Sequence, residues 1–291
     1  MPMRTESTSP RRLDGRGRSK RGRAFLTGDA IRRRWNKMTG FHGVKRLLAI
    51  VCIVLGSGQS YAQNQSAPRF KAIAFDYFVI FDPNSLIPEV DKAFPGKGAE
   101  FTKLWRAKQF DYCFLRTITN RHADFSKVTE DALVYTAEEM KLDLSPEIRK
   151  RLLNAYLALK PWPDAVDALR KLKASGMRII TIANFSPKML RSNADAAGIT
   201  DLFDDLLSTE ENGTYKPDPR AYELGVERLK LRKEEIVFAA FGGWDAYGAK
   251  TFGYPTYWVN RFNLPAEELG IEADQTSNNM NGLVNFVLGH P

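Results

Sequence analysis

Four polar residues suited to chemistry follow short hydrophobic runs at widely separated places in the chain: Asp76, Asn184, Lys216 and Asp245. Such runs are typical of strands in a parallel sheet, and ligands of open α/β sheets bind at the carboxyl edge of the strands. We therefore expect the four side chains to converge at one edge. Two carboxylates and an ammonium in that place indicate a carboxylate nucleophile, Asp76, with charged support from the other two.

Each of these residues also has a plainer interpretation. Asp76 is consistent with an aspartate that caps a turn, Lys216 with a surface lysine in a polar loop, and Asp245 with a carboxylate that compensates a helix dipole. Asn184 precedes a predicted helix start at Ser186, where backbone N–H groups bind anions. Only their common location favours catalysis over these local roles.

The formal net charge of +9 belongs to the N-terminal part of the chain. Residues 1–62 hold 14 Lys/Arg and 3 Asp/Glu, whereas the other 229 residues hold 29 basic and 31 acidic side chains. The basic pI therefore gives no support for nucleic-acid binding by the folded part.

The N-terminal part has the pattern of a secretory signal. Lys45 and Arg46 precede an apolar run at 47–56, and small and polar residues lead to Ala62. This pattern predicts cleavage after Ala62, and Met38 would start a signal of ordinary length. The run is shorter than the ~20 residues that span a bilayer, so we expect a periplasmic or secreted protein with no stable membrane anchor.

The order of the predicted elements divides the rest of the chain. Residues 63–82 hold the first strand, residues 83–160 only helices, and in residues 161–291 strands alternate with helices. The alternation predicts an α/β fold, a Rossmann-like parallel-sheet core with an inserted all-helical cap. The apolar run 70–81 is predicted as one strand and the polar tail 274–281 as loop. A cap inserted after the first strand lies above the carboxyl edge, where it can exclude water.

The predicted cap contributes one candidate residue. Arg106 lies on a predicted helix and can reach the site as a cation, although a solvated arginine fits the sequence equally well. The histidines (His42, His122 and His290) are far apart, so no metal centre is predicted.

Taken together, these residues resemble the haloacid dehalogenase superfamily and, within it, the type II L-2-haloacid dehalogenases. The resemblance covers residues 70 to about 285. It is carried by AFDYFVIFD at 74–82, AFPGKGAEFTKLWRAKQFDYCFLR at 93–116, TEDAL at 129–133, IANFSP at 182–187, YKPDPRAYEL at 215–224 and GGWDAYGAKTFGYPTYWVNR at 242–261.

The resemblance implies hydrolytic dehalogenation of short-chain 2-haloalkanoic acids without metal or cofactor. Asp76 would attack the carbon that bears the halogen, and water would then hydrolyse the aspartyl ester. The roles implied for the other residues are halide binding by Arg106, halide and carboxylate binding by Asn184, pairing with the nucleophile by Lys216, orientation by Tyr222, preparation of the water by Asp245, and substrate contacts by Tyr77, Phe78 and Trp244. A homodimer is also expected from the resemblance.

Five positions depart from the family pattern that the resemblance implies. Phe78, Ile80, Ala183, Ala240 and Gly242 stand where the family has hydrogen-bonding side chains. Each lost donor in a buried site costs on the order of 1–3 kcal/mol. An alternative is therefore a catalytically diverged or inactive dehalogenase-like protein that binds small carboxylates. A superfamily phosphatase is less favoured, because its second aspartate is replaced here by Phe78.

Overall fold

The computed structural model describes residues 70–289. The basic extension and the secretory signal predicted in residues 1–62, with the cleavage site after Ala62, lie outside the described residues. Within residues 70–289, no helix combines the length and the apolar character needed to cross a bilayer.

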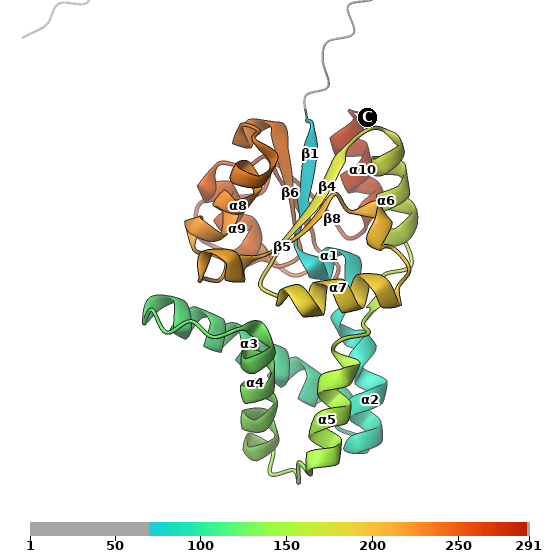
Figure 1. The fold of residues 1–291 in the computed structure, drawn as a ribbon, viewed down its shortest axis with the longest axis vertical. Helices are drawn as coiled ribbons and strands as arrows, with labels where there is room; N and C mark the ends of the chain where they lie inside the picture. The colour runs from blue at the N-terminus through green and yellow to red at the C-terminus, as the bar shows by residue number, and fades with distance from the viewer. Residues whose placement is uncertain (1–69, 290–291) are drawn as a thin grey trace, which may run out of the picture. The chain divides into compact units, whose positions relative to one another are not determined.

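A six-stranded parallel sheet forms the centre of the core (Figure 1). Its strands, in the spatial order β5-β4-β1-β6-β7-β8, are β5 (Asp205–Ser208), β4 (Arg178–Ala183), β1 (Ala72–Phe75), β6 (Ile236–Ala240), β7 (Thr256–Val259) and β8 (Gln275–Ser277). Every neighbouring pair is parallel. The strands β1 and β6 are buried along their whole length, as their apolar sequences require. The predicted fold class is confirmed.

Helices cover both faces of this sheet. On one face lie α6 (Ala165–Ala174), α7 (Pro187–Ala196) and α10 (Met280–Leu288), and on the other lie α8 (Pro219–Leu229) and α9 (Gly243–Phe252) (Figure 1). Side chains alternate along β1, so Ile73 and Phe75 join the hydrophobic cluster of the first face while Ala72 and Ala74 join that of the second. Three short 3₁₀ helices connect the elements: η2 (Thr200–Leu202), η3 (Thr209–Asn212) and η4 (Lys233–Glu235).

The insertion after the first strand is helical. It consists of η1 (Pro83–Leu86), α2 (Ile87–Ala93), α3 (Gly98–Ile118), α4 (Phe125–Glu139) and α5 (Pro146–Ala155). The chain enters through β2 (Phe81–Asp82) and returns through β3 (Lys160–Pro161), and these two strands pair with each other. Asp124 and Ser145 cap α4 and α5 by accepting hydrogen bonds from backbone N–H groups.

Contacts between the two parts hold the cap over the carboxyl edge of the sheet. The backbone N–H of Phe125 donates to Glu210 at 2.7 Å, and the hydroxyls of Ser126 and Ser186 lie 3.0 Å apart. The Tyr215 hydroxyl donates to the backbone carbonyl of Ala123. These contacts start from the beginning of α4, so they fix the side of the cap that faces the core.

Two predictions of local structure were wrong. The run 70–81 is not one strand, because β1 ends at Phe75 and α1 (Tyr77–Ile80) forms a single helical turn. Asp76 causes this change by accepting a hydrogen bond from the Phe78 N–H, which starts the turn. The polar tail 274–281 is not a loop: β8 occupies the edge of the sheet, where polar residues are tolerated, and α10 begins at Met280.

Candidate active site

A pocket of about 570 Å³ lies between the carboxyl edge of the sheet and the cap helix α3. Asp76 after β1, Asn184 after β4 and Gly242 after β6 line it from the core side. From the cap it is lined by residues of α3 spaced four or three apart, which places them on one helical face: Ala99, Lys103, Arg106, Phe110 and Cys113.

Lys216 connects the two predicted carboxylates. Its Nζ lies 2.7 Å from Asp76 Oδ2 and 2.7 Å from Asp245 Oδ2. The side chains of Lys216 and Asp245 are fully buried, whereas 12% of the Asp76 side chain is exposed. Asp76 is therefore the member of this triad that faces the pocket, and the other two support it from beneath.

Burial and charge act against each other in this triad. Burial alone would lower the pKa of Lys216, but the charges of Asp245 and Asp76 and their hydrogen bonds raise it above its ordinary value. Burial raises the pKa of Asp245 to about 7, an effect that Lys216 opposes and the charge of Asp76 reinforces. The lysine is thus a permanent cation, and Asp245 titrates near neutral pH.

Asp76 is held ready for attack. Its Oδ1 accepts from the Phe78 N–H at 2.8 Å and its Oδ2 from Lys216, so both oxygens are oriented. Each carboxylate oxygen keeps a further lone pair for bond formation. The turn of α1 that carries Phe78 is itself anchored, since the Trp162 indole donates to the Phe78 carbonyl at 2.9 Å.

Arg106 stands opposite the nucleophile with no ion-pair partner among residues 70–289. Its guanidinium lies over two rings, 5.0 Å from the centroid of Phe78 and 5.5 Å from that of Phe241. Burial lowers the pKa of Arg106, although Tyr156 and Asp76 act in the opposite direction. An arginine remains protonated even so. A buried guanidinium that makes no salt bridge keeps N–H donors available for an anion.

Asn184 has its carbonyl oxygen committed to the core. Its Oδ1 accepts from the Lys216 backbone N–H at 2.9 Å and from the Thr209 hydroxyl at 3.2 Å. This arrangement positions the segment that carries Lys216. It also fixes the amide orientation, which leaves the Nδ2 group as a donor for a ligand in the pocket.

The two predicted tyrosines occupy different places. The Tyr222 hydroxyl donates to Asp245 Oδ1 at 2.7 Å, so this residue orients the triad from below. Tyr77 was predicted to contact substrate, but the structure places it outside the pocket: its hydroxyl donates to the Leu190 carbonyl at 2.7 Å, and the side chain is fully buried. The helical turn after Asp76 directs Tyr77 into the core, whereas Phe78 and Trp244 do line the pocket.

The expected departures from the family pattern leave residues without polar side-chain atoms at and below the pocket. Ile80, Ala183 and Ala240 are fully buried apolar residues. Gly242 lines the pocket, and a Cβ there would lie 2.6 Å from Nε1 of Trp244. The indole therefore occupies the space next to Gly242 and contacts Phe110 of α3, with ring centroids 4.6 Å apart.

Sequence reasoning missed most of the pocket's apolar wall and two of its cations, Lys103 and Arg261. The missed residues include Phe110, Phe125, Phe185, Phe241 and Phe262. Arg261, also missed, donates to the Val79 carbonyl at 3.0 Å and pairs with Asp164 at 2.8 Å, which ties the end of β7 to the turn after Asp76. The helical spacing of Phe110 and Arg106 was the only sequence signal available for this wall.

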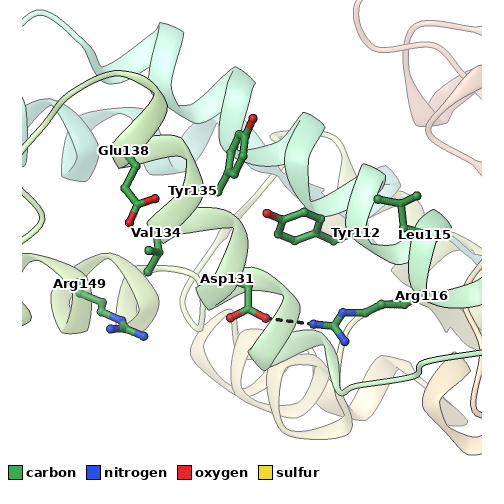
Figure 2. A pocket seen from close by; sticks show the side chains of 8 residues that line it. All are labelled: Tyr112, Leu115, Arg116, Asp131, Val134, Tyr135, Glu138 and Arg149. Carbon is green, nitrogen blue, oxygen red and sulfur yellow. Dashed lines mark hydrogen bonds and ion pairs between the residues drawn. The ribbon is translucent and has the colours of Figure 1, made fainter. Parts of the chain in front are cut away.

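A second hollow of about 580 Å³ lies within the cap, between α3, α4 and α5 (Figure 2). Three of its charged residues form ion pairs: Arg116 with Asp131 at 3.1 Å, and Arg149 with Glu130, which lies outside the lining, at 2.6 Å. It contains none of the predicted site residues. Within the described part of the chain, no group of three or more His, Cys, Asp or Glu side chains is arranged to hold a metal ion.

Residues 70–253 match the family model of the haloacid dehalogenase-like hydrolases. The chain is 43% identical over 205 residues to the (S)-2-haloacid dehalogenase of Pseudomonas sp. (strain YL), covering 70% of this chain and 88% of that protein. It is 38% identical over 220 residues to the haloacetate dehalogenase H-2 of Moraxella sp. (strain B), covering 75% and 98%.

Solved structures show the same likeness. The L-2-haloacid dehalogenase from Xanthobacter autotrophicus with chloropropionic acid covalently bound superposes with a TM-score of 0.72 at 30% identity. The match covers 76% of this chain and all of that one.

Proposed function

This chain belongs to the haloacid dehalogenase-like hydrolases, and we propose that it hydrolyses the carbon–halogen bond of 2-haloalkanoic acids through an ester of Asp76. The relatives named above are dehalogenases of such acids. The observation that carries the proposal is that a pocket-facing carboxylate, Asp76, shares the pocket with an arginine, Arg106, that makes no salt bridge with the described residues.

In the first step, an oxygen of Asp76 attacks C2 of the substrate from the side opposite the halogen. The C–O bond forms as the carbon–halogen bond breaks, and the bonding electron pair leaves with the halide. Negative charge grows on the halogen during this step, so the unpaired guanidinium of Arg106 stabilises the transition state more than the ground state.

The substrate carboxylate needs donors of its own. The Nδ2 group of Asn184 is one of them. A second source is the start of α9, because its N-cap residue, Gly242, lines the pocket and has no side chain to satisfy the first N–H groups of the helix. Such helix starts attract anions. These N–H donors take the place of some of the hydrogen-bonding side chains that are absent at Ala183, Ala240 and Gly242.

In the second step, water from the pocket attacks the Cγ carbon of the Asp76 ester. Its proton passes to the buried Asp245 through the ammonium of Lys216, which contacts both carboxyl groups. The pKa of about 7 belongs to the resting protein; once Asp76 is a neutral ester its charge no longer raises the pKa of Asp245, which is then a carboxylate at neutral pH and accepts the proton. The ammonium of Lys216 donates to the developing oxyanion at Asp76, where it already binds Oδ2. Collapse of the intermediate breaks the bond between Cγ and the substrate oxygen, and the proton held by Asp245 passes to that oxygen as the 2-hydroxy acid leaves. Asp76 then loses the second proton of the water to solvent and is again a carboxylate.

A single turnover in heavy-oxygen water tests this route. With enzyme in excess over (S)-2-chloropropionate, the hydroxy acid takes its new oxygen from Asp76, so mass spectrometry finds the label in the peptide that contains Asp76. Label in the hydroxy acid alone would mean direct attack by water and would sink the proposal. Halide release by Asp76→Asn at the wild-type rate contradicts it equally.

We also propose that the mature protein is exported. The support is the basic pair Lys45 and Arg46 before the apolar run 47–56, followed by small and polar residues up to Ala62. N-terminal sequencing of protein from the periplasm or medium of a Gram-negative host is expected to begin at Gln63. A cell-associated protein that retains residues 1–62 would refute export.

A further inference from the structure

The pocket is larger than a short haloacid needs. A three-carbon chloroacid has six non-hydrogen atoms and fills roughly 200 Å³, at the volume that a water molecule takes in the liquid for each atom. The pocket measures about 570 Å³. More than half of it is therefore available for a substituent larger than a methyl group.

The apolar wall of this pocket contains a continuous row of phenyl rings. Neighbouring centroids lie 5.1 Å apart for Phe125 and Phe185, 5.2 Å for Phe185 and Phe78, 5.7 Å for Phe78 and Phe241, and 5.7 Å for Phe241 and Phe262. All five rings line the pocket. Arg106 lies over the middle of the row, above Phe78 and Phe241. A ring of the ligand can therefore extend the row while its halogen remains at the guanidinium.

One end of the row is open. Phe262 is 39% exposed and Leu264 is 57% exposed, although both line the pocket. On another part of the wall, Trp244 and Phe110 contribute further aromatic surface. Large apolar side chains that stay exposed at a pocket mark a surface that a ligand covers. Aromatic rings are the groups that pack best there, in tilted or edge-to-face contacts.

We infer that the preferred substrates are 2-halo acids whose C2 carries an arylmethyl group, with the ring seated on Phe241 and Phe262 and the halogen at Arg106. This inference rests on the proposed function. It differs from it in naming which haloacids the site takes. A 2-halo-3-phenylpropionate has twelve non-hydrogen atoms and fills roughly 400 Å³, which the pocket can hold.

Three substrates test the inference on the wild-type protein: (S)-2-bromopropionate, (S)-2-bromo-3-phenylpropionate and (S)-2-bromooctanoate. Halide release gives kcat/KM for each. We expect the phenyl acid to exceed the methyl acid at least tenfold and the octanoate at least threefold. In Phe262→Ala the ratio of phenyl to methyl acid falls about fivefold, because one ring contact is lost.

Leu269→Ala is the matched control. Leu269 lies on the same β7–β8 connection, is 55% exposed and does not line the pocket, so its ratio stays at the wild-type value. No halide from any of the three acids would overturn the proposed function itself. Release from the methyl acid as fast as from the phenyl acid leaves that function standing and overturns the inference. If kcat/KM for the octanoate equals that for the phenyl acid, the assignment of an aryl group is also overturned. The same holds if the ratio of phenyl to methyl acid falls equally in Phe262→Ala and Leu269→Ala.

Discussion

Removing the ammonium of Lys216 is expected to make the stability of the protein strongly dependent on pH. In Lys216→Met the side chain keeps most of its apolar volume, but Asp76 and Asp245 lose the cation that lies 2.7 Å from each. Opposite charges about 4 Å apart attract by about 4 kcal/mol at an effective dielectric constant of 20. That energy corresponds to about three pKa units for Asp245, in addition to the rise that burial already causes.

The direction in which the free energy of unfolding changes with pH depends on whether the folded or the unfolded state binds the proton more tightly. A carboxyl with a raised pKa in the folded state ionises first in the unfolded state, so the free energy of unfolding falls as pH rises between the two pKa values. In the wild type this fall ends near pH 7, the pKa of Asp245. In Lys216→Met it continues for about three further units, at about 1.4 kcal/mol per unit. The raised pKa of Lys216 keeps the lysine charged throughout this range.

Urea unfolding of both proteins at pH 6 and pH 9 measures the effect. The loss of unfolding free energy caused by Lys216→Met is expected to be about 2–3 kcal/mol greater at pH 9 than at pH 6. In Lys216→Met/Asp245→Asn the difference between the two pH values disappears, because asparagine cannot ionise and still accepts the hydrogen bond from Tyr222. Equal losses at both pH values in the single variant would refute the electrostatic reasoning.

Three further outcomes are expected. Arg106→Met lowers kcat for halide release about 100- to 1,000-fold, the usual loss for one preorganised charge-stabilising donor, and a loss below threefold in steady-state assays would exclude it from the reaction. The ¹³C carboxyl resonance of Asp245 is expected to titrate near pH 7 in the wild type, and a midpoint near pH 4 would contradict this. In Tyr222→Phe the midpoint is expected to rise by about one to two pH units, because a hydrogen bond to the ionised carboxylate is lost. Gly248→Ala lowers the free energy of unfolding by about 1–3 kcal/mol in urea titrations, since the new Cβ would lie 2.4 Å from the Tyr222 hydroxyl, whereas helix propensity alone predicts a gain of about 1 kcal/mol.

The sheet was predictable because its central strands are buried on both faces and therefore read as apolar runs. The first turn after β1 was not, because residues 70–81 are apolar throughout and one side chain, Asp76, ends the strand. The prediction of a loop for residues 274–281 was wrong for a different reason. β8 lies at the edge of the sheet and is polar, while Met280, Leu283 and Val287 of α10 carry a helical spacing that the prediction overlooked.

Asp76 and Asp245 could be found from the sequence because each lies just beyond a buried apolar strand, and parallel strands bring such residues to one edge. Lys216 lies in the connection after η3 and Arg106 on the cap helix α3, so neither follows a strand directly.

The aromatic wall could not be found in this way. Phe185 and Phe262 lie in connections whose path depends on tertiary packing, and nothing in their neighbours distinguishes a pocket residue from a core residue. Tyr77 shows the same limit, since one helical turn decides whether it faces ligand or core.

The ammonium of Lys216 has two anionic neighbours only until the first covalent bond forms. Esterification makes Asp76 neutral, so the repulsion that disfavours the ionised form of Asp245 vanishes and the ammonium is left with a single counter-ion. The pKa of Asp245 then falls, and a group that is partly protonated in the resting protein becomes a carboxylate once the ester exists. The charges of Asp76, Lys216 and Asp245 thus bring Asp245 fully into its ionised, proton-accepting form only after the ester has formed, and no change of backbone conformation is needed for this order of steps.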